Sequence, residues 1–288
     1  MRATARRRHL APARVHAGAQ AARSILVSMA IPWLQADSPL PPTSAALDER
    51  SEAPGLLAAG GGLSIARLRN AYAHGVFPWY SPGQPVLWWS PDPRMLLRTA
   101  DFKLSHSLRK TLRRFLRAPG CELRFDHDTP QVMAHCAQTP RDGQDGTWIV
   151  PEMQAAYGAW ARAGDVHSVE TWMDGELVGG LYGVNIGRMM FGESMFSHRT
   201  DASKIALAGL VAFCRWHDMP AIDCQQATGH LASLGAAPIP RAAFEQEVRA
   251  LVAKAPAPVW AYDFRMWGTL DLGLPADPTP AHSHDLPP

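Results

Sequence analysis

Two short motifs in the second half of the sequence carry polar side chains whose types and spacing could support chemistry. The first places Glu193 in a run of glycine, methionine and phenylalanine residues. A carboxylate in apolar surroundings must be paired, because its burial without a partner is unfavourable. The partner of Glu193 could be the cation of Arg199 or Lys204, or an amine or hydroxyl group of a ligand.

The second motif is Asp223-Cys-Gln225, which lies on a predicted short strand. Side chains two residues apart project from the same face of a strand. Asp223 could therefore hydrogen-bond the Gln225 amide and fix its orientation. Taken alone, these two residues favour a satisfied polar pair in the core over a functional site.

A third feature is the segment 105–117, which combines an apolar stripe with a surplus of positive charge. Leu108, Leu112 and Phe115 recur at helical spacing, which predicts an amphipathic helix. No acidic residue in the segment offsets its five cations, so the pattern predicts either a solvated helix face or contact with phosphates. These cations are Arg109, Lys110, Arg113, Arg114 and Arg117.

The composition excludes several classes of protein. A chain of 288 residues with 47% hydrophobic and 19% charged residues is not mainly disordered. Its four cysteines are too few and too scattered for a disulfide scaffold. No apolar run approaches the roughly 20 residues that a transmembrane helix needs. With a net charge of +2, any surface for nucleic acid must be a local patch.

The elements that must position these residues follow an α+β plan. From residue 167 onward the pattern predicts two strands joined by a tight turn, another strand, a helix, a short strand and a last helix. This order matches acyltransferases of the GNAT type, although the loop that binds the CoA pyrophosphate in that superfamily is missing. We expect a disordered or poorly ordered extension at 1–54. A smaller N-terminal α/β domain, with a Trp/Pro-rich loop and the basic helix, should follow at 55–144, and a GNAT-like acyltransferase domain at 145–262. Residues 263–288 should form a Pro/His-rich tail.

Seven motifs between about residues 55 and 260 form an ordered set. They are Gly55-Leu-Leu-Ala-Ala-Gly-Gly, Gly75-Val-Phe-Pro-Trp-Tyr, Leu87-Trp-Trp-Ser-Pro-Asp-Pro-Arg94, Gly146-Thr-Trp-Ile, Phe191-Gly-Glu-Ser-Met-Phe-Ser, Asp201-Ala-Ser-Lys and Ile222-Asp-Cys-Gln. This set strongly resembles the leucyl/phenylalanyl-tRNA–protein transferase family. The resemblance implies a cytoplasmic bacterial enzyme that moves Leu or Phe, and Met less well, from aminoacyl-tRNA onto proteins with an N-terminal Arg or Lys. The added residue would mark those proteins for degradation through the N-end rule.

Carried over to this sequence, the resemblance implies that Asp223 and Gln225 are the catalytic pair and that Glu193 contacts the substrate. It also implies a set of aromatic residues around the 3′-terminal adenosine of the tRNA and the acceptor site: Tyr72, Trp79, Trp148 and Tyr157. The implied pocket for the aminoacyl side chain comprises Leu181, Met190, Met195, Leu207, Leu210, Cys214 and Ile222. The sequence departs from the family pattern at 181, 210 and 214, where Met or Phe is more usual, and at 201, where Asp replaces the expected Asn.

The resemblance implies no cofactor, ATP or metal, because the ester that joins the amino acid to the ribose is already activated. Its partners would be aminoacyl-tRNA and the acceptor protein, without a membrane, and the enzyme would act as a monomer. Two other classes remain open. A CoA-dependent acetyltransferase lacks its pyrophosphate loop here, and a non-catalytic RNA-binding module would leave Glu193, Asp223 and Gln225 without a role.

Overall fold

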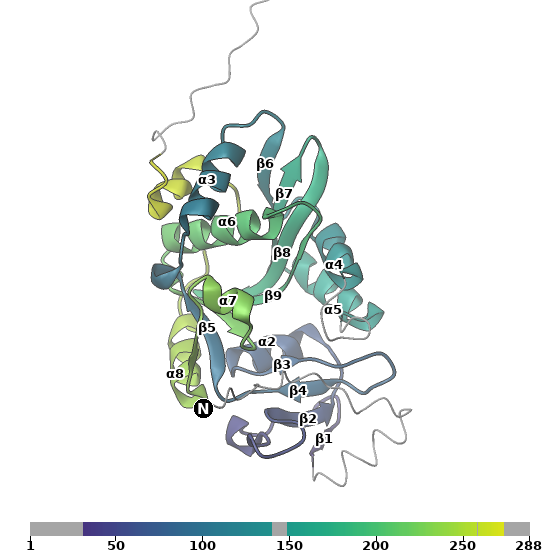
Figure 1. Cartoon of the computed structure of the whole chain (residues 1–288). Helices are drawn as coiled ribbons and strands as arrows, with labels where there is room; N and C mark the ends of the chain where they lie inside the picture. Colours follow the sequence, from purple (N-terminus) through teal and green to yellow (C-terminus); the bar gives the residue numbers. More distant parts are fainter. Residues whose placement is uncertain (1–30, 140–148, 258, 274–288) are drawn as a thin grey trace, which may run out of the picture.

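Two β-sheets form the framework of the protein in a computed structural model, which describes residues 31–139, 149–257 and 259–273 (Figure 1). The smaller sheet has the strand order β1-β2-β4-β3 and is built from the N-terminal part of the chain. β1 pairs with β2 in parallel, and the other neighbours are antiparallel. Its strands are β1 (Trp33–Leu34), β2 (Leu56–Gly60), β3 (Phe77–Pro78) and β4 (Leu87–Trp89).

The larger sheet has the strand order β11-β5-β10-β9-β8-β7-β6. All its neighbouring strands are antiparallel except β9 and β10, which run parallel. In chain order the strands are β5 (Arg94–Arg98), β6 (Cys121–Phe125), β7 (Val166–Met173), β8 (Glu176–Ile186), β9 (Met189–Ser197), β10 (Ala221–Gln225) and β11 (Ala237–Ile239).

The helices begin where the sequence provides caps. Ser64, Ser105 and Asp128 each accept a hydrogen bond from a backbone N–H of the first turn, which satisfies one of the free donors at a helix start. The helices are α2 (Ile65–Ala73), α3 (His106–Phe115), α4 (Thr129–Gln138), α5 (Pro151–Arg162), α6 (Ala202–Trp216), α7 (Gly229–Ser233) and α8 (Arg241–Val252), with 3₁₀ turns η1 (Thr43–Ala45), η2 (Thr99–Asp101) and η3 (Phe264–Leu270).

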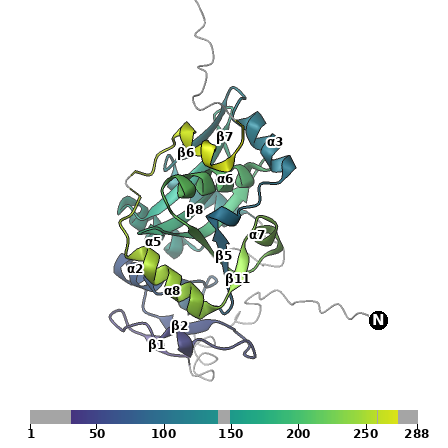
Figure 2. The ribbon, with the colours of Figure 1, turned by 90° about the vertical axis from the view of Figure 1, so that its left-hand side faces the viewer.

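The larger sheet separates two hydrophobic cores. α6, α3 and η3 pack against one face, and α4 and α5 pack against the other, where the core continues into the smaller sheet (Figure 1). The smaller sheet and α3 lie at opposite ends of the molecule, as Figure 2 also shows. No helix among the described residues is both long and apolar enough to cross a bilayer.

The predicted α+β class with a smaller N-terminal part is confirmed. The predicted order in the second half is observed as far as β10: β7, β8 and β9 form an antiparallel meander, α6 follows, and β10 then returns beside β9. Between β10 and the predicted last helix, α8, the structure adds α7 and β11. The division between the sheets falls between Trp89 and Arg94, because β5 and β6 pair into the larger sheet. The predicted domain boundary near residue 145 lies outside the described residues and stays a prediction.

The poorly ordered extension predicted for 1–54 needs correction over residues 31–54. This segment contains β1 and η1, and β1 pairs with β2. The guanidinium of Arg67 on α2 donates to the carbonyls of Gln35, Ala36 and Ser38 and so holds the segment against the fold. Sequence patterning missed it because the contact joins residues about thirty positions apart.

Candidate functional site

The pairing between β9 and β10 stops part-way along β9. Three residues of β10, Ala221 to Asp223, lie beside Met189 to Phe191. Beyond them, β8 is the only strand that pairs with β9 among the described residues. At this point both strands carry an extra residue. Glu193 interrupts the β9 ladder with β8, and Cys224 interrupts the β10 ladder with β5. Such bulges redirect side chains and are common beside active sites.

The bulges bring Glu193 and Gln225 together at a partly exposed position. The hydroxyl of Tyr72 on α2 donates to Glu193 Oε1 at 2.7 Å, and Gln225 Nε2 lies 3.5 Å from the same oxygen. The hydroxyl of Tyr157 on α5 hydrogen-bonds that of Tyr72. Four of the predicted site residues thus meet at one point, supplied by four different elements.

Asp223 lies directly beneath this point and is fully buried. Arg94, at the start of β5, donates from Nε and Nη2 to the two oxygens of Asp223 at 2.8 and 2.5 Å. Asp223 Oδ1 also accepts the backbone N–H of Gln225 at 2.9 Å. We call Tyr72, Arg94, Glu193, Asp223 and Gln225 the junction site, because helix α2 meets strands β5, β9 and β10 of the larger sheet there.

The prediction that Asp223 holds the side-chain amide of Gln225 is wrong in this detail. The bulge at Cys224 and the left-handed backbone of Gln225, with φ of 51°, break the alternation of side chains along β10. The carboxylate therefore binds the backbone of Gln225, and the amide is left to reach Glu193.

The environment of Glu193 favours its protonated form. Burial, reinforced by the nearby Asp223 carboxylate, raises the pKa of Glu193 to about 8, against the opposing effect of the Tyr72 hydrogen bond. Arg199 and Lys204, the cations considered from the sequence, pair with Glu176 and Asp201 instead. A cationic group of a ligand that reaches Glu193 would restore its charge.

Of the aromatic residues predicted around the adenosine and the acceptor site, Tyr72 and Tyr157 share one environment and Trp79 lies in another. The rings of Tyr72 and Tyr157 both pack against Trp160, and burial raises the pKa of both phenols well above its usual value. Trp79 is buried, packs edge-on against Trp89 and accepts that residue's indole N–H at its backbone carbonyl. Trp148 lies outside the described residues.

The residues predicted to hold the aminoacyl side chain belong to a single hydrophobic cluster, on the α6 face of the larger sheet. Leu181 of β8 lies opposite Met195 of β9, and Met190 lies beside Ile222 of β10. α6 covers them with Leu207, Leu210 and Cys214. All are buried except Met195, which is partly exposed. The structure therefore gathers these seven residues into one apolar group.

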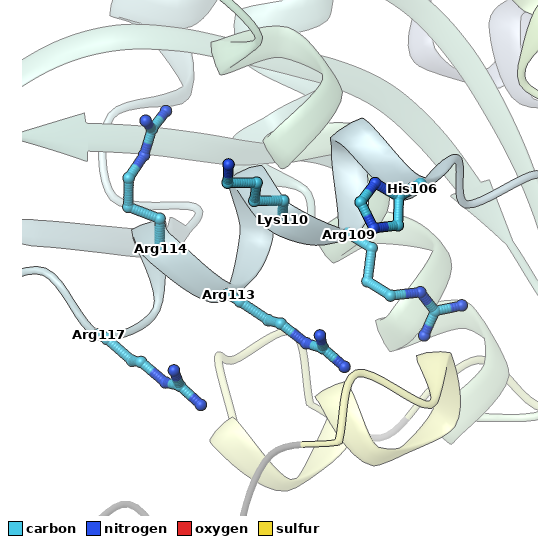
Figure 3. Close-up of a pocket in the computed structure, with 6 residues that line it drawn as sticks. All are labelled: His106, Arg109, Lys110, Arg113, Arg114 and Arg117. Atoms are coloured by element: carbon cyan, nitrogen blue, oxygen red, sulfur yellow. The ribbon is translucent and has the colours of Figure 1, made fainter.

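The five cations predicted to contact phosphates line an open hollow of about 510 Å³ together with His106 (Figure 3). We call Arg109, Lys110, Arg113, Arg114 and Arg117 the basic face. Within the part of the chain that the structure describes, none of them forms a salt bridge. Unpaired cations gathered on one helix favour an anionic ligand.

The basic face is divided by its contacts with the C-terminal segment. Arg109 donates to the carbonyl of Asp271, and Arg113 Nε donates to that of Leu272 at 2.6 Å. Figure 3 shows these two side chains pointing to the yellow C-terminal segment, whereas Lys110 and Arg114 point away from it. The described residues contain no group of three or more His, Cys, Asp or Glu side chains that could hold a metal ion.

The family of this chain follows from comparison with known proteins. A family model described as leucyl/phenylalanyl-tRNA protein transferase matches residues 96–249, and a model of that family's N-terminal domain matches residues 61–92. The chain belongs to this family. Leucyl/phenylalanyl-tRNA–protein transferases from Methylibium petroleiphilum and Leptothrix cholodnii are each 64% identical to it, over 85% and 87% of this chain and 93% and 99% of their own lengths.

The predicted family and enzyme class, an aminoacyltransferase, are thus confirmed. Among solved structures, a GCN5-related N-acetyltransferase from Kribbella flavida is similar over 60% of each chain, with 12% identity and a TM-score of 0.27.

Sequence reasoning about this family member missed Arg94. It ends the motif Leu87-Trp-Trp-Ser-Pro-Asp-Pro-Arg94, but it follows a proline-rich stretch and its partner lies 129 residues further along the chain. The available signal was a pair of opposite charges, Arg94 and Asp223, each next to apolar residues of its strand.

Proposed function

We propose that this transferase moves Leu or Phe, and Met less well, from aminoacyl-tRNA to the α-amino group of proteins that begin with Arg or Lys. The product would be a degradation signal of the N-end rule in the bacterial cytoplasm. Membership of the family supports this proposal. The observation that carries it is the meeting of Glu193 and Gln225, both partly exposed, where the pairing of β9 and β10 ends.

In the proposed reaction, the α-amine of the acceptor attacks the carbonyl carbon of the aminoacyl ester. A C–N bond forms, the C–O bond to the ribose breaks, and the ribose hydroxyl leaves with the proton that the amine gives up. Because an α-amine has a pKa of about 7.7–8.0, a useful fraction is neutral without a strong base. The ester is already activated, so neither ATP nor a metal is required.

The side chains of the junction site have different roles in this reaction. The Gln225 amide orients the amine against the ester carbonyl, and this positioning supplies most of the rate. Glu193 accepts a hydrogen bond from an amino group of the substrate, and the approach of a cation would favour its charged form. Asp223 is buried and paired with Arg94, so its charge is not available to select an N-terminal Arg or Lys.

Selection of the transferred residue rests on apolar fit. The cluster around Met190 and Ile222 offers no charged partner to the aminoacyl side chain, which suits Leu, Phe and Met. Such a pocket discriminates by about 1–3 kcal/mol for each methylene group. Its methionines adapt to unequal shapes, because their side chains are unbranched and flexible.

The basic face would hold the tRNA through phosphate contacts, without reading bases. Lys110, Arg114 and Arg117 are exposed cations that hold no carbonyl of the described C-terminal segment, and they are the best placed for this contact. Phosphate contacts position a nucleic acid but carry no sequence information.

A transfer assay tests the proposal. The protein is incubated with Leu-tRNA and a peptide beginning with Arg, and we expect the peptide to gain the mass of one leucine. Gln225→Ala should abolish most of this gain while leaving tRNA binding intact. Gln226→Ala is the matched control, because Gln226 is a neighbouring, partly exposed amide that is not assigned to the site. Equal activity of the two variants would remove Gln225 from the mechanism, and acetylation by acetyl-CoA would replace the proposed reaction.

A further inference from the structure

Arg94 occupies a place that the transfer reaction itself does not explain. It is only 1% exposed and begins β5, the first strand of the larger sheet in chain order after β4 of the smaller sheet. Its guanidinium carbon lies 4.7 and 4.6 Å from the ring centroids of Phe77 and Phe244. A guanidinium packed against two aromatic rings is restricted in its orientation, so its N–H groups can act as rigid donors.

One edge of the guanidinium fixes the position of Gln225 through Asp223. We call this chain of contacts the Gln225 arm. Nε and Nη2 bind both oxygens of Asp223, and Asp223 Oδ1 accepts the backbone N–H of Gln225. Gln225 has a left-handed backbone, which is strained for a residue with a side chain and persists only when its surroundings impose it. The Arg94–Asp223 pair contributes to imposing it, because Asp223 accepts the backbone N–H of Gln225.

The third nitrogen of the guanidinium fixes the position of Tyr72 through Gly75. We call this chain of contacts the Tyr72 arm. Nη1 donates to the carbonyl of Gly75 at 3.0 Å, and the N–H of Gly75 donates to the carbonyl of Tyr72 at 3.0 Å. Tyr72 then reaches Glu193 Oε1 with its hydroxyl group. Both arms therefore end on the same oxygen of Glu193, and both begin at one guanidinium.

From this closed chain of contacts we infer that Arg94 is a positioning residue for aminoacyl transfer, which sets the Gln225 amide and the Tyr72 hydroxyl at their separation across Glu193. The inference rests on the proposed function. Arg94 touches no substrate and acts only through Asp223 and Gly75. A misplacement of about 1 Å in reacting groups can lower a rate by about a hundredfold, so a shift in either arm should reduce turnover.

Arg94→Lys is the first test, because lysine keeps the charge but cannot bind two carboxylate oxygens and a carbonyl in one plane. The matched control is Arg215→Lys. Arg215 also donates to three backbone carbonyls, those of Thr99, Ala100 and Thr269, but it lies at the other end of β10. We expect Arg94→Lys to lower kcat about 10- to 100-fold while KM for Leu-tRNA changes by less than about twofold. Arg215→Lys should leave kcat near the wild-type value.

A second variant keeps the test decisive if Arg94→Lys does not fold. The double substitution Arg94→Met with Asp223→Leu replaces the buried ion pair by apolar side chains, an exchange that is often neutral or stabilising. It should fold and still lose at least about tenfold in kcat, because Gln225 no longer has its anchor. A folded variant of either kind with wild-type kcat would overturn the inference.

A structural readout separates this inference from the proposed function. In Arg94→Lys the NMR signals of the Gln225 backbone N–H and side-chain amide should shift, and in Arg215→Lys they should not. If the wild-type protein transfers no leucine, the proposed function fails, and these signals still decide whether Arg94 sets the Gln225 arm. Unchanged signals in Arg94→Lys would reject the inference even if the wild-type enzyme is active.

Discussion

The junction site and the basic face both depend on positive side chains, but they use them in opposite ways. At the junction site the cation of Arg94 is buried and its donors are satisfied by Asp223 and Gly75. On the basic face four of the five cations are exposed and none is in a salt bridge among the described residues. A buried cation acts through one fixed geometry, whereas exposed cations act through a field that salt screens.

The largest expected difference between the junction site and the basic face is in the free energy of unfolding. Arg94→Met leaves the Asp223 carboxylate buried without its cation, which should lower the free energy of unfolding by about 3–5 kcal/mol. Arg114→Gln removes an exposed charge and should change it by no more than about 0.5 kcal/mol. Urea denaturation of both variants measures the difference. Similar losses in the two would mean that the junction site and the basic face do not differ as described.

A smaller effect is expected from Glu193, the carboxyl group of the junction site that has no cation. The folded protein keeps a proton on Glu193 that the unfolded chain releases above a pKa of 4.5, and it loses that proton only near pH 8. The free energy of unfolding therefore falls as the pH rises through this window. Glu193→Gln removes the effect, so the variant should gain on the order of 1–3 kcal/mol relative to wild type between about pH 5 and about pH 8.

The control for this pH effect is Glu49→Gln, which changes an exposed glutamate. Its stability should follow the wild-type curve at every pH. If the curve of Glu193→Gln also runs parallel to that of the wild type, Glu193 does not keep its proton near neutral pH, and the junction site is less isolated from water than its contacts indicate.

The smallest effect is expected within the basic face. Arg114→Gln should reduce the slope of log affinity for tRNA against log salt concentration by about one, without changing thermal stability. Arg113→Gln should also lower the melting temperature, because Arg113 holds the carbonyl of Leu272. Titrations at several salt concentrations check the first effect, and thermal unfolding checks the second. An unchanged slope in Arg114→Gln would remove this residue from the tRNA surface.

The sequence was sufficient to predict the basic face but only part of the junction site. The apolar stripe of α3 and its unpaired cations are local patterns, and the helix forms where they predict it. Glu193 was identified as a candidate by its polar character in an apolar run, whereas Gln225 became a candidate through the family resemblance, because its local pattern favoured a polar pair in the core. Their mutual arrangement depends on two bulges and a left-handed residue, which no local periodicity indicates.

Long-range contacts account for the rest of what was missed. Strand β5 follows a proline-rich stretch and pairs with β10 and β11, more than a hundred residues away in the sequence. Its position in the larger sheet follows from those partners and from the ion pair between Arg94 and Asp223, and not from its own composition. For the same reason the order of residues 31–54, held by Arg67, was not predicted.

Because the φ of Gln225 is positive, thermal stability and catalytic activity favour different residues at this position. A glycine adopts this backbone without strain, whereas a residue with a long side chain is destabilised there by about 1–3 kcal/mol. Directed evolution that selects only for survival at high temperature would therefore favour Gln225→Gly and discard the amide. Any such library for this enzyme should keep position 225 unchanged and draw its stabilising substitutions from elsewhere in the chain.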